Sequence, residues 1–167
     1  DGCAIKYIKN PSEKIQLAAV SKSGYAIQFI ENPSKEVQLV AVKKDYLAIS
    51  FIKKPTEQMK LIAVKQDGHA LGYIKNPTEE MKLVAIQKNG YAIQYIKDPS
   101  EELQMIAVKR DAAVIYLIKN PSEKVQLFVV NKDPKYVEHI NYPTEKVLLT
   151  AVKKDGNSIK YIKDPTE

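Results

Sequence analysis

Residues 76–97 read NPTEEMKLVAIQKNGYAIQYIK, and this stretch recurs with changes from one end of the chain to the other. A series of prolines marks its period, because they follow one another at a constant interval. These prolines are Pro11, Pro33, Pro55, Pro77, Pro99, Pro121, Pro143 and Pro165. A fixed period of this size predicts a repeat array, in which stacked repeats share a core that one repeat is too short to bury.

The repeats divide the 167 residues without insertion or deletion. We predict a single array made of a half repeat at 1–9, a series of full repeats of equal length, and a partial repeat at 164–167. The full repeats are 10–31, 32–53, 54–75, 76–97, 98–119, 120–141 and 142–163. Since both ends of the sequence fall within a repeat, we expect the chain to be a piece of a longer array.

Each repeat opens with a sequence that is typical of a helix N-terminus. In the first full repeat we expect Asn10 to cap the helix, Pro11 to take its first position and Glu13 to reach back to the cap. The signal weakens in the repeats where a lysine or a tyrosine replaces the asparagine, because these side chains are poor caps. The first half of each repeat is therefore predicted to be a helix of about ten residues.

A second, shorter apolar segment completes each repeat. We expect Gly24 to end the first helix in a left-handed conformation, after which residues 25–30 form the second segment. The following Asn32-Pro33 prevents this segment from continuing into the next repeat, because proline disfavours helix at the residue before it. Such a short segment is predicted to be a helix with some 3₁₀ character.

Small residues recur at two places in the repeat and allow neighbouring backbones to approach closely. One column holds Ala19, Ala41, Ala63, Ala85, Ala107 and Ala151, and the other holds Ala26, Ala48, Ala70 and Ala92. We therefore predict an all-α fold, an α-solenoid of stacked 22-residue helical hairpins, each with a long helix and a short helix.

An α/β or β solenoid is the alternative fold. Asn89-Gly90 lies between two apolar runs and is a strong signal for a β-hairpin turn. The glycine position also holds Tyr46, Ala112 and Pro134 in other repeats, which a two-residue hairpin turn would not accept. This variation and the helix-start signal favour the all-α fold.

The segment AVKQDGHALGYI, residues 63–74, resembles the short tandem repeats of DUF4116, a domain family of unknown function found in bacterial and viral proteins. The resemblance covers essentially the whole chain, although the repeats of that family run slightly longer. Its motif consists mostly of small and apolar residues. The resemblance implies a tandem helical repeat and carries over neither an activity nor any functional residue.

Few residues in the sequence suit catalysis or metal binding. His69 and His139 fall in different columns about three repeats apart, so we expect them not to share a site, and Cys3 is the single cysteine. The sequence has no glycine-rich phosphate loop, no Cys/His metal spacing and no Gly-x-Ser-x-Gly motif. We therefore predict a non-enzymatic protein without a cofactor or a metal ion.

The sequence also bears on where the protein works. Its apolar runs reach about five or six residues, whereas crossing a bilayer takes about 20, so we predict no membrane partner. No signal-peptide pattern opens the sequence, and one cysteine excludes a disulfide within the chain. We expect a reducing, cytoplasmic location.

An aromatic column runs through the second segments. It holds Tyr7, Phe29, Phe51, Tyr73, Tyr95 and Tyr161, with Leu117 and His139 at the equivalent places. An exposed ladder of rings could stack nucleic-acid bases. Because Leu117 replaces a ring, we predict instead that this position packs in the core.

Two other columns of the second segment differ from repeat to repeat. In a repeat array, positions of this kind can carry the specificity for a partner, although a solvated face that varies freely has the same pattern. We call the following candidate residues the variable face: Tyr25, His69, Tyr91, Gln94, Tyr116, Lys135 and Glu138.

Charge is concentrated between the two helices of each repeat, where short linkers carry +5 of the chain's formal charge of +6. We call the cationic residues there the lysine edge: Lys22, Lys43, Lys44, Lys65, Lys88, Lys109, Arg110, Lys132, Lys153 and Lys154. Cations at a helix C-terminus stabilise its dipole, and a basic edge can also attract nucleic acid or an acidic partner. Because Arg110 is the only arginine, sequence-specific reading of bases is not favoured.

Two functions follow from these features. The first is a scaffold for protein–protein interaction, which needs no catalytic site and uses the repeated face. The second is a nucleic-acid-binding array that uses the lysine edge. The sequence identifies neither the partner nor the oligomeric state.

Overall fold

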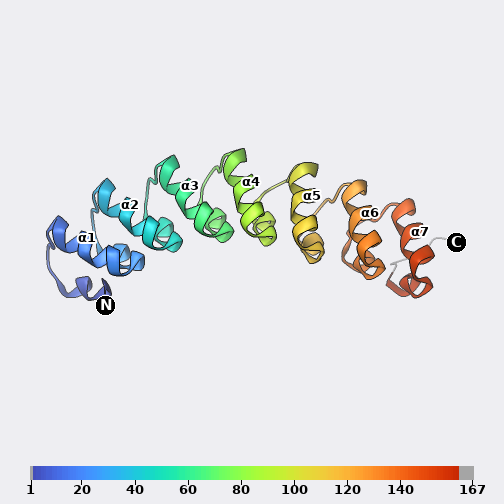
Figure 1. Ribbon diagram of the computed structural model, residues 1–167, viewed down its shortest axis with the longest axis horizontal. Coiled ribbons are helices and arrows are strands. Elements are labelled where there is room, and N and C mark those ends of the chain that lie inside the picture. The colour runs from blue at the N-terminus through green and yellow to red at the C-terminus, as the bar shows by residue number, and fades with distance from the viewer. Residues whose placement is uncertain (1, 162–167) are drawn as a thin grey trace. The chain divides into compact units, whose positions relative to one another are not determined.

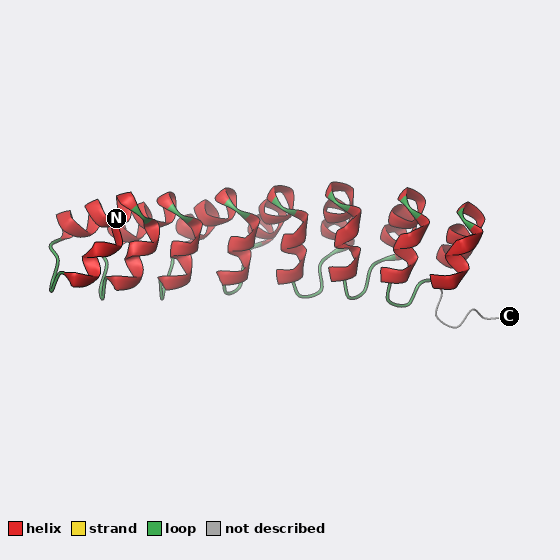
Figure 2. Ribbon diagram, turned by 90° about the horizontal axis from the view of Figure 1, so that it is seen from below, coloured by secondary structure: helices red, strands yellow, loops and turns green. Residues whose placement is uncertain are grey.

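A computed structural model describes residues 2–161 of the chain, so the predicted partial repeat at 164–167 lies outside the described residues. The described residues form helices joined by short loops and contain no strand (Figure 2). The α-helices are α1 (Glu13–Lys22), α2 (Lys35–Lys44), α3 (Glu57–Gln66), α4 (Glu79–Lys88), α5 (Glu101–Arg110), α6 (Glu123–Lys132) and α7 (Glu145–Lys154). The all-α prediction is therefore confirmed.

Short 3₁₀ helices alternate with the α-helices. They are η1 (Gly2–Tyr7), η2 (Gly24–Phe29), η3 (Tyr46–Phe51), η4 (Gly68–Tyr73), η5 (Gly90–Tyr95), η6 (Ala112–Leu117), η7 (Pro134–His139) and η8 (Gly156–Tyr161). The second segment of each described repeat is thus wholly 3₁₀, which extends the sequence prediction. A segment this short makes only a couple of turns in the tighter winding, a length at which the 3₁₀ form is common.

The chain divides into two compact modules, a first module at Asp1–Lys88 and a second module at Asn89–Glu167. Within the first module, α1 to α4 pack on one another in chain order, and each 3₁₀ helix packs on the α-helices next to it (Figure 1). The second module repeats this pattern with α5 to α7. Contacts between neighbouring repeats are those of a helical solenoid. The predicted repeat boundaries, and a single array across both modules, stay predictions.

The helix caps lie two residues later than the sequence predicted. The α-helices begin after Ser or Thr, and the hydroxyl of Thr56 accepts a hydrogen bond from the backbone N–H of Met59 at 3.2 Å. Ser34 caps α2 in the same way, with Val37 as the donor at 3.3 Å. Asn10 is not a cap: it lies outside α1 with φ at 53°, in the left-handed region that asparagine tolerates.

Glycine does not end the helices as predicted, because no glycine among the described residues has a positive φ. The helix α1 ends at an extended Ser23, and Gly24 begins η2. A Cβ atom on Gly24 would lie 2.4 Å from the carbonyl oxygen of Ala41 in the next helix. Glycine is therefore needed here for close approach between repeats and not for its left-handed conformations.

Alanine columns form the centre of the core, as the sequence predicted. Ala41 and Ala63 in the α-helices and Ala48 and Ala70 in the 3₁₀ helices have no exposed surface. Branched residues such as Val42 fill the space beside them and are also fully buried. Small residues at each contact keep neighbouring helices close, so the repeats share a buried apolar interior within a module.

Candidate binding surfaces

Four aromatic rings lie on the surface of the first module. They end successive 3₁₀ helices, and we call them the aromatic ladder: Tyr7, Phe29, Phe51 and Tyr73. Their exposed fractions run from 39% for Phe51 to 81% for Tyr7. The prediction that these rings pack in the core is wrong. In η3 the core is already filled by Ala48 and Ile49, so the ring that ends the helix remains outside.

A ring of the variable face joins the ladder. Tyr25, at the start of η2, packs edge-on against Phe51 at the end of η3, with the ring centroids 5.1 Å apart and the planes at 86°. Edge-to-face packing of this kind is a favourable aromatic arrangement. Tyr25 is 42% exposed, so the pair forms a connected apolar patch across two neighbouring repeats.

The second module does not continue the ladder. Tyr95 ends η5 and is exposed, but Leu117 and His139 hold the equivalent places in η6 and η7. Tyr161 ends η8 and is half-buried. Consecutive exposed rings are therefore a property of the first module.

The remaining residues of the variable face are all accessible to solvent. His69 and Tyr91 are half-buried, whereas Gln94, Tyr116, Lys135 and Glu138 are exposed. Tyr25 and His69 belong to the first module and the others to the second. The structure thus places these residues on the surface and distributes them over both modules.

The side chains of Tyr91 and His69 in the variable face interact with carboxylates. The hydroxyl of Tyr91 donates to the carboxylate of Asp111 at 3.1 Å, and this bond and the negative charge raise the pKa of the tyrosine. The imidazole Nδ1 of His69 lies 2.8 Å from the carboxylate of Asp67. Burial raises the pKa of Asp67, but hydrogen bonds from the backbone and ring of His69, together with the charges of His69 and Lys88, outweigh it and lower the pKa.

All ten residues of the lysine edge are exposed in the last turns of their α-helices. None of the ten forms an ion pair within residues 2–161, and Lys154 donates instead to the backbone carbonyl of Asn131. The carboxylates nearby are held by the backbone, since Asp45 accepts from the N–H of Leu47 at 2.9 Å. The cationic groups of this edge are therefore exposed to solvent and available to an anionic partner.

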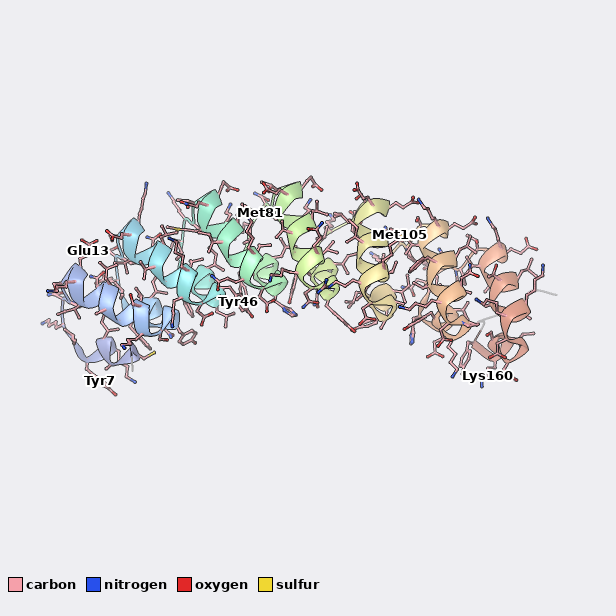
Figure 3. All side chains as sticks on the ribbon, viewed as in Figure 1. Tyr7, Glu13, Tyr46, Met81, Met105 and Lys160 are labelled. Atoms are coloured by element: carbon pink, nitrogen blue, oxygen red, sulfur yellow. The ribbon has the colours of Figure 1, made fainter. Side chains whose placement is uncertain are left out.

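Four ion pairs lie at the opposite end of the α-helices. We call this end the helix-start edge; Glu13 lies on it in Figure 3, and Tyr46 lies on the other edge of the first module. The ion pairs are Lys60–Glu57 at 2.7 Å, Lys82–Glu79 at 2.5 Å, Lys124–Glu101 at 3.3 Å and Lys146–Glu123 at 3.2 Å. The first two join residues of one helix, and the last two join neighbouring repeats. Charge compensation here agrees with the net positive charge of the lysine edge.

A basic cavity in the first module was not predicted. It measures about 420 Å³ and is lined by Ile49, Ser50, Ile52, Lys53, Lys54, Pro55, Lys60, Tyr73 and Lys75. The sequence does hold a signal, because Lys54 replaces the usual Asn or Asp and Lys60 replaces the usual Gln of the repeat. From the sequence alone, Lys54 is predicted only to be a poor helix cap, and no cavity is predicted beside it.

Residues suited to metal binding or nucleophilic chemistry are dispersed. Within residues 2–161 no three of the His, Cys, Asp and Glu side chains are grouped so that they could hold a metal ion. His69 lies in the first module and His139 in the second, and Cys3 is half-buried in η1. No helix in the described part of the chain is long and apolar enough to cross a bilayer.

Comparison with protein-family models, with curated proteins and with solved structures found no match to the chain.

Proposed function

We propose that the protein is a non-enzymatic repeat scaffold that binds an extended segment of a partner protein along its aromatic ladder. The observation that carries this proposal is the exposure of a ring at the same place in four consecutive 3₁₀ helices. Rings supply a large contact area at little cost in side-chain entropy and are enriched in the centres of protein interfaces. The resemblance to the DUF4116 repeats, which implies a tandem helical scaffold, stays a prediction.

The spacing of the rings favours an extended partner. The ladder offers one ring per repeat, so a chain segment that follows the repeats meets a ring at regular intervals. The neighbouring variable positions differ from repeat to repeat, as with Tyr25, Leu47 and His69, and can distinguish one partner sequence from another. Recognition of a peptide in this way combines repeated anchors with local specificity.

Selection from a random peptide library displayed on phage tests this proposal. We expect the chain to enrich peptides that share apolar anchors, and the triple variant F29S/F51S/Y73S to bind them at least about tenfold more weakly, because a buried interface ring contributes about 1 kcal/mol or more. The matched control I15S/L149S/I159S also removes three exposed apolar side chains, all outside the ladder. Failure to enrich any shared sequence, or equal loss in both variants, would refute the proposal. Far-UV circular dichroism confirms that each variant is folded.

A second candidate function is binding of nucleic acid at the lysine edge, and the exposed, unpaired cations favour it. The edge residues precede each 3₁₀ helix and the ring ends it, so the two features lie about 10 Å or more apart along that helix. Single-stranded nucleic-acid sites usually combine rings and cations in one groove, which the lysine edge and the ladder do not form together, so a protein partner is preferred over nucleic-acid binding at that edge.

Titration of labelled single-stranded and double-stranded oligonucleotides at several salt concentrations separates the two functions. Nucleic-acid binding predicts an affinity that falls log-linearly with salt and is lost when Lys43, Lys44, Lys109 and Arg110 become glutamate. The ladder variant should then bind as the unmodified chain does. An absence of binding at low salt removes this second function.

A further inference from the structure

The basic cavity of the first module lies between the ends of two successive 3₁₀ helices. Ser50 comes from η3 and Tyr73 from η4, while Lys53 and Lys54 come from the loop that leads into α3. Lys60 lies in α3 itself and completes the wall. Its volume of about 420 Å³ falls within the range of small-molecule binding sites.

Four ammonium groups line this cavity, and no carboxylate does. Lys60 forms an ion pair with the carboxylate of Glu57 at 2.7 Å. The side chain of Glu57 is 65% exposed and does not line the cavity. The side chain of Lys60 is only 14% exposed, so its charge is partly withdrawn from water. An anion that enters the cavity meets several cations in a setting less screened than open surface.

The start of α3 adds to this positive field. Pro55 lines the cavity and directly precedes Thr56, the N-cap of this ten-residue helix. The N-terminal end of an α-helix carries a partial positive charge and unpaired backbone N–H groups. Lysine ammonium groups and a helix N-terminus together form a setting that suits phosphate.

The second module holds an equivalent cavity that serves as an internal comparison. It measures about 200 Å³ and is lined by Asp98, Pro99, Gln104, Lys119 and Asn120. Four of these residues occupy the same repeat positions as Lys54, Pro55, Lys60 and Lys75, two repeats earlier. Aspartate and glutamine thus replace two of the lysines, so the formal charge of the lining is zero in the second module and +4 in the first.

Glutamine also closes the second cavity. The amide nitrogen of Gln104 donates to the carbonyls of Pro99 at 2.9 Å and Asn120 at 3.2 Å, and its oxygen accepts from the N–H of Ser122 at 3.0 Å. Lys60 cannot make this set of bonds, because an ammonium group has no acceptor. At the same repeat positions, the glutamine and aspartate of the second module thus accompany a small neutral cavity, and the lysines of the first module accompany a larger basic one.

We propose that the basic cavity of the first module binds a small polyphosphate group, such as that of a nucleoside triphosphate. Four point charges at one compact site suit clustered phosphate oxygens better than the spaced carboxylates of an acidic peptide. Tyr73 is 50% exposed at the wall of the cavity and offers a face on which a base can stack. This proposal does not rest on the function proposed for the aromatic ladder, although the two sites share Tyr73.

Isothermal titration calorimetry at low salt tests the site, with sodium tripolyphosphate, ATP and orthophosphate as separate probes. We expect tripolyphosphate to bind with a stoichiometry of one and orthophosphate at least about tenfold more weakly, because fewer charges are engaged. ATP should bind more tightly than tripolyphosphate, and Y73A should remove that difference alone. An oligoglutamate peptide that competes as well as tripolyphosphate would overturn the assignment to phosphate.

The variant K54D/K60Q gives the first module the residues of the second. It should weaken tripolyphosphate binding by about tenfold or more, since two of the four cations are lost. The control K14D/K35Q makes the same change in net charge at exposed lysines elsewhere in the first module and should bind as the unmodified chain does. Equal weakening in both would show a general charge effect and overturn the proposal.

A single substitution tests the site with less risk of disturbing the fold. K54N restores the asparagine found at this position in most repeats and should weaken binding by about threefold to tenfold while leaving the far-UV circular dichroism spectrum unchanged. Absence of any tripolyphosphate binding by the folded, unmodified chain refutes the site whatever the behaviour of the variants. The binding of tripolyphosphate by these variants does not test the peptide binding proposed for the aromatic ladder. Only Y73A affects both, because Tyr73 belongs to the cavity and to the ladder.

Discussion

The two modules differ in how closely backbones approach at the lysine edge and in which side chains bridge the helix-start edge. In the first module the backbones approach closely at the lysine edge, where Gly2 faces the carbonyl oxygen of Ala19 and Gly24 faces that of Ala41. In the second module Gln104 and Gln126 bridge to the next repeat at the helix-start edge. The helix-start edge of the second module is thus bridged by buried side-chain amides, whereas the bridging amide of the first module, Gln66, lies at the other end of its helix and donates to the carbonyl of Val42 at 2.6 Å.

Side-chain packing at each edge agrees with this difference. Gln38 of the first module donates to Pro33 of its own loop at 2.9 Å and is half-buried, whereas Gln104 and Gln126 are buried. Conversely, a Cβ atom on Gly90 of the second module would lie 3.2 Å from the carbonyl oxygen of Ala107, which is looser than at Gly24. The same residue type therefore has a different structural role in each module.

The largest expected effect is at the glycines of the lysine edge. Gly24→Ala places a Cβ atom 2.4 Å from a backbone oxygen that cannot move alone, so we expect a loss of about 2–3 kcal/mol in the free energy of unfolding. Gly90→Ala should cost about 1 kcal/mol or less, because the neighbour has to shift by only a few tenths of an ångström. Urea unfolding, with hydrogen exchange of α1 and α2 as the local readout, measures both.

Gly156→Ala is the matched control, since nothing lies within 4 Å of the added Cβ atom. Its free energy of unfolding should change by about 0.5 kcal/mol at most, because the glycine has no positive φ. Equal behaviour of Gly24→Ala and Gly156→Ala would show that close approach does not fix the repeats of the first module.

A smaller effect is expected at the bridging glutamines. Gln104→Leu removes three hydrogen bonds and leaves the N–H of Ser122 and two carbonyls without this partner, at a cost of about 1–3 kcal/mol. Gln38→Leu removes one bond at a half-buried site and should cost about 1 kcal/mol or less. Differential scanning calorimetry of the two variants provides the comparison, and the opposite order of stability would contradict it.

The smallest effect concerns the ion pairs between repeats of the second module. A hydrogen bond from Ser122 and the charge of Lys124 lower the pKa of Glu101, and Thr144 and Lys146 do the same for Glu123. A carboxylate whose pKa is lower in the folded state stabilises the fold above its unfolded pKa. This contribution to stability is lost as the pH falls through the pKa that the carboxyl group has in the folded state. Acid should therefore loosen the helix-start edge of the second module, by a small amount since both glutamates are exposed.

Carbon-detected NMR titration of the glutamate carboxyl groups checks this sign. Glu101 and Glu123 should titrate below the range of a free glutamate. Ser122→Ala and Lys124→Ala should each raise the pKa of Glu101, because the hydrogen bond from Ser122 and the hydrogen bond and charge of Lys124 all lower it. An unchanged pKa in both variants would contradict these causes.

The features that sequence could predict are those that repeat. The constant period, the helix-start signal and the alanine columns each recur several times, so they indicate stacked helices independently of any one repeat. Burial of Ala41 and Ala63 confirms the packing argument drawn from these columns. Burial of a small residue follows from its role in close approach, which recurs in every full repeat except 120–141, where Val129 takes the place of the alanine.

Features that depend on a neighbouring repeat could not be read from one repeat alone. The need for glycine at Gly24 comes from the carbonyl of Ala41, which belongs to the following repeat. The exposure of Phe51 depends on how fully Ala48 and Ile49 fill the core behind it. A single leucine in the aromatic column suggested burial, but a leucine is also tolerated at a half-exposed position such as Leu117.

The basic cavity shows how an array of this kind can acquire a new property. Two of its lysines, Lys54 and Lys60, belong to one repeat, and Lys54 is the only lysine at its position in the sequence, whereas the alanines that hold the stack recur in the neighbouring repeats unchanged. Because contacts are made mainly between neighbours, two substitutions in one copy leave the others undisturbed. A local change of charge in one repeat of such an array can therefore create a binding site without altering the packing that the other repeats provide.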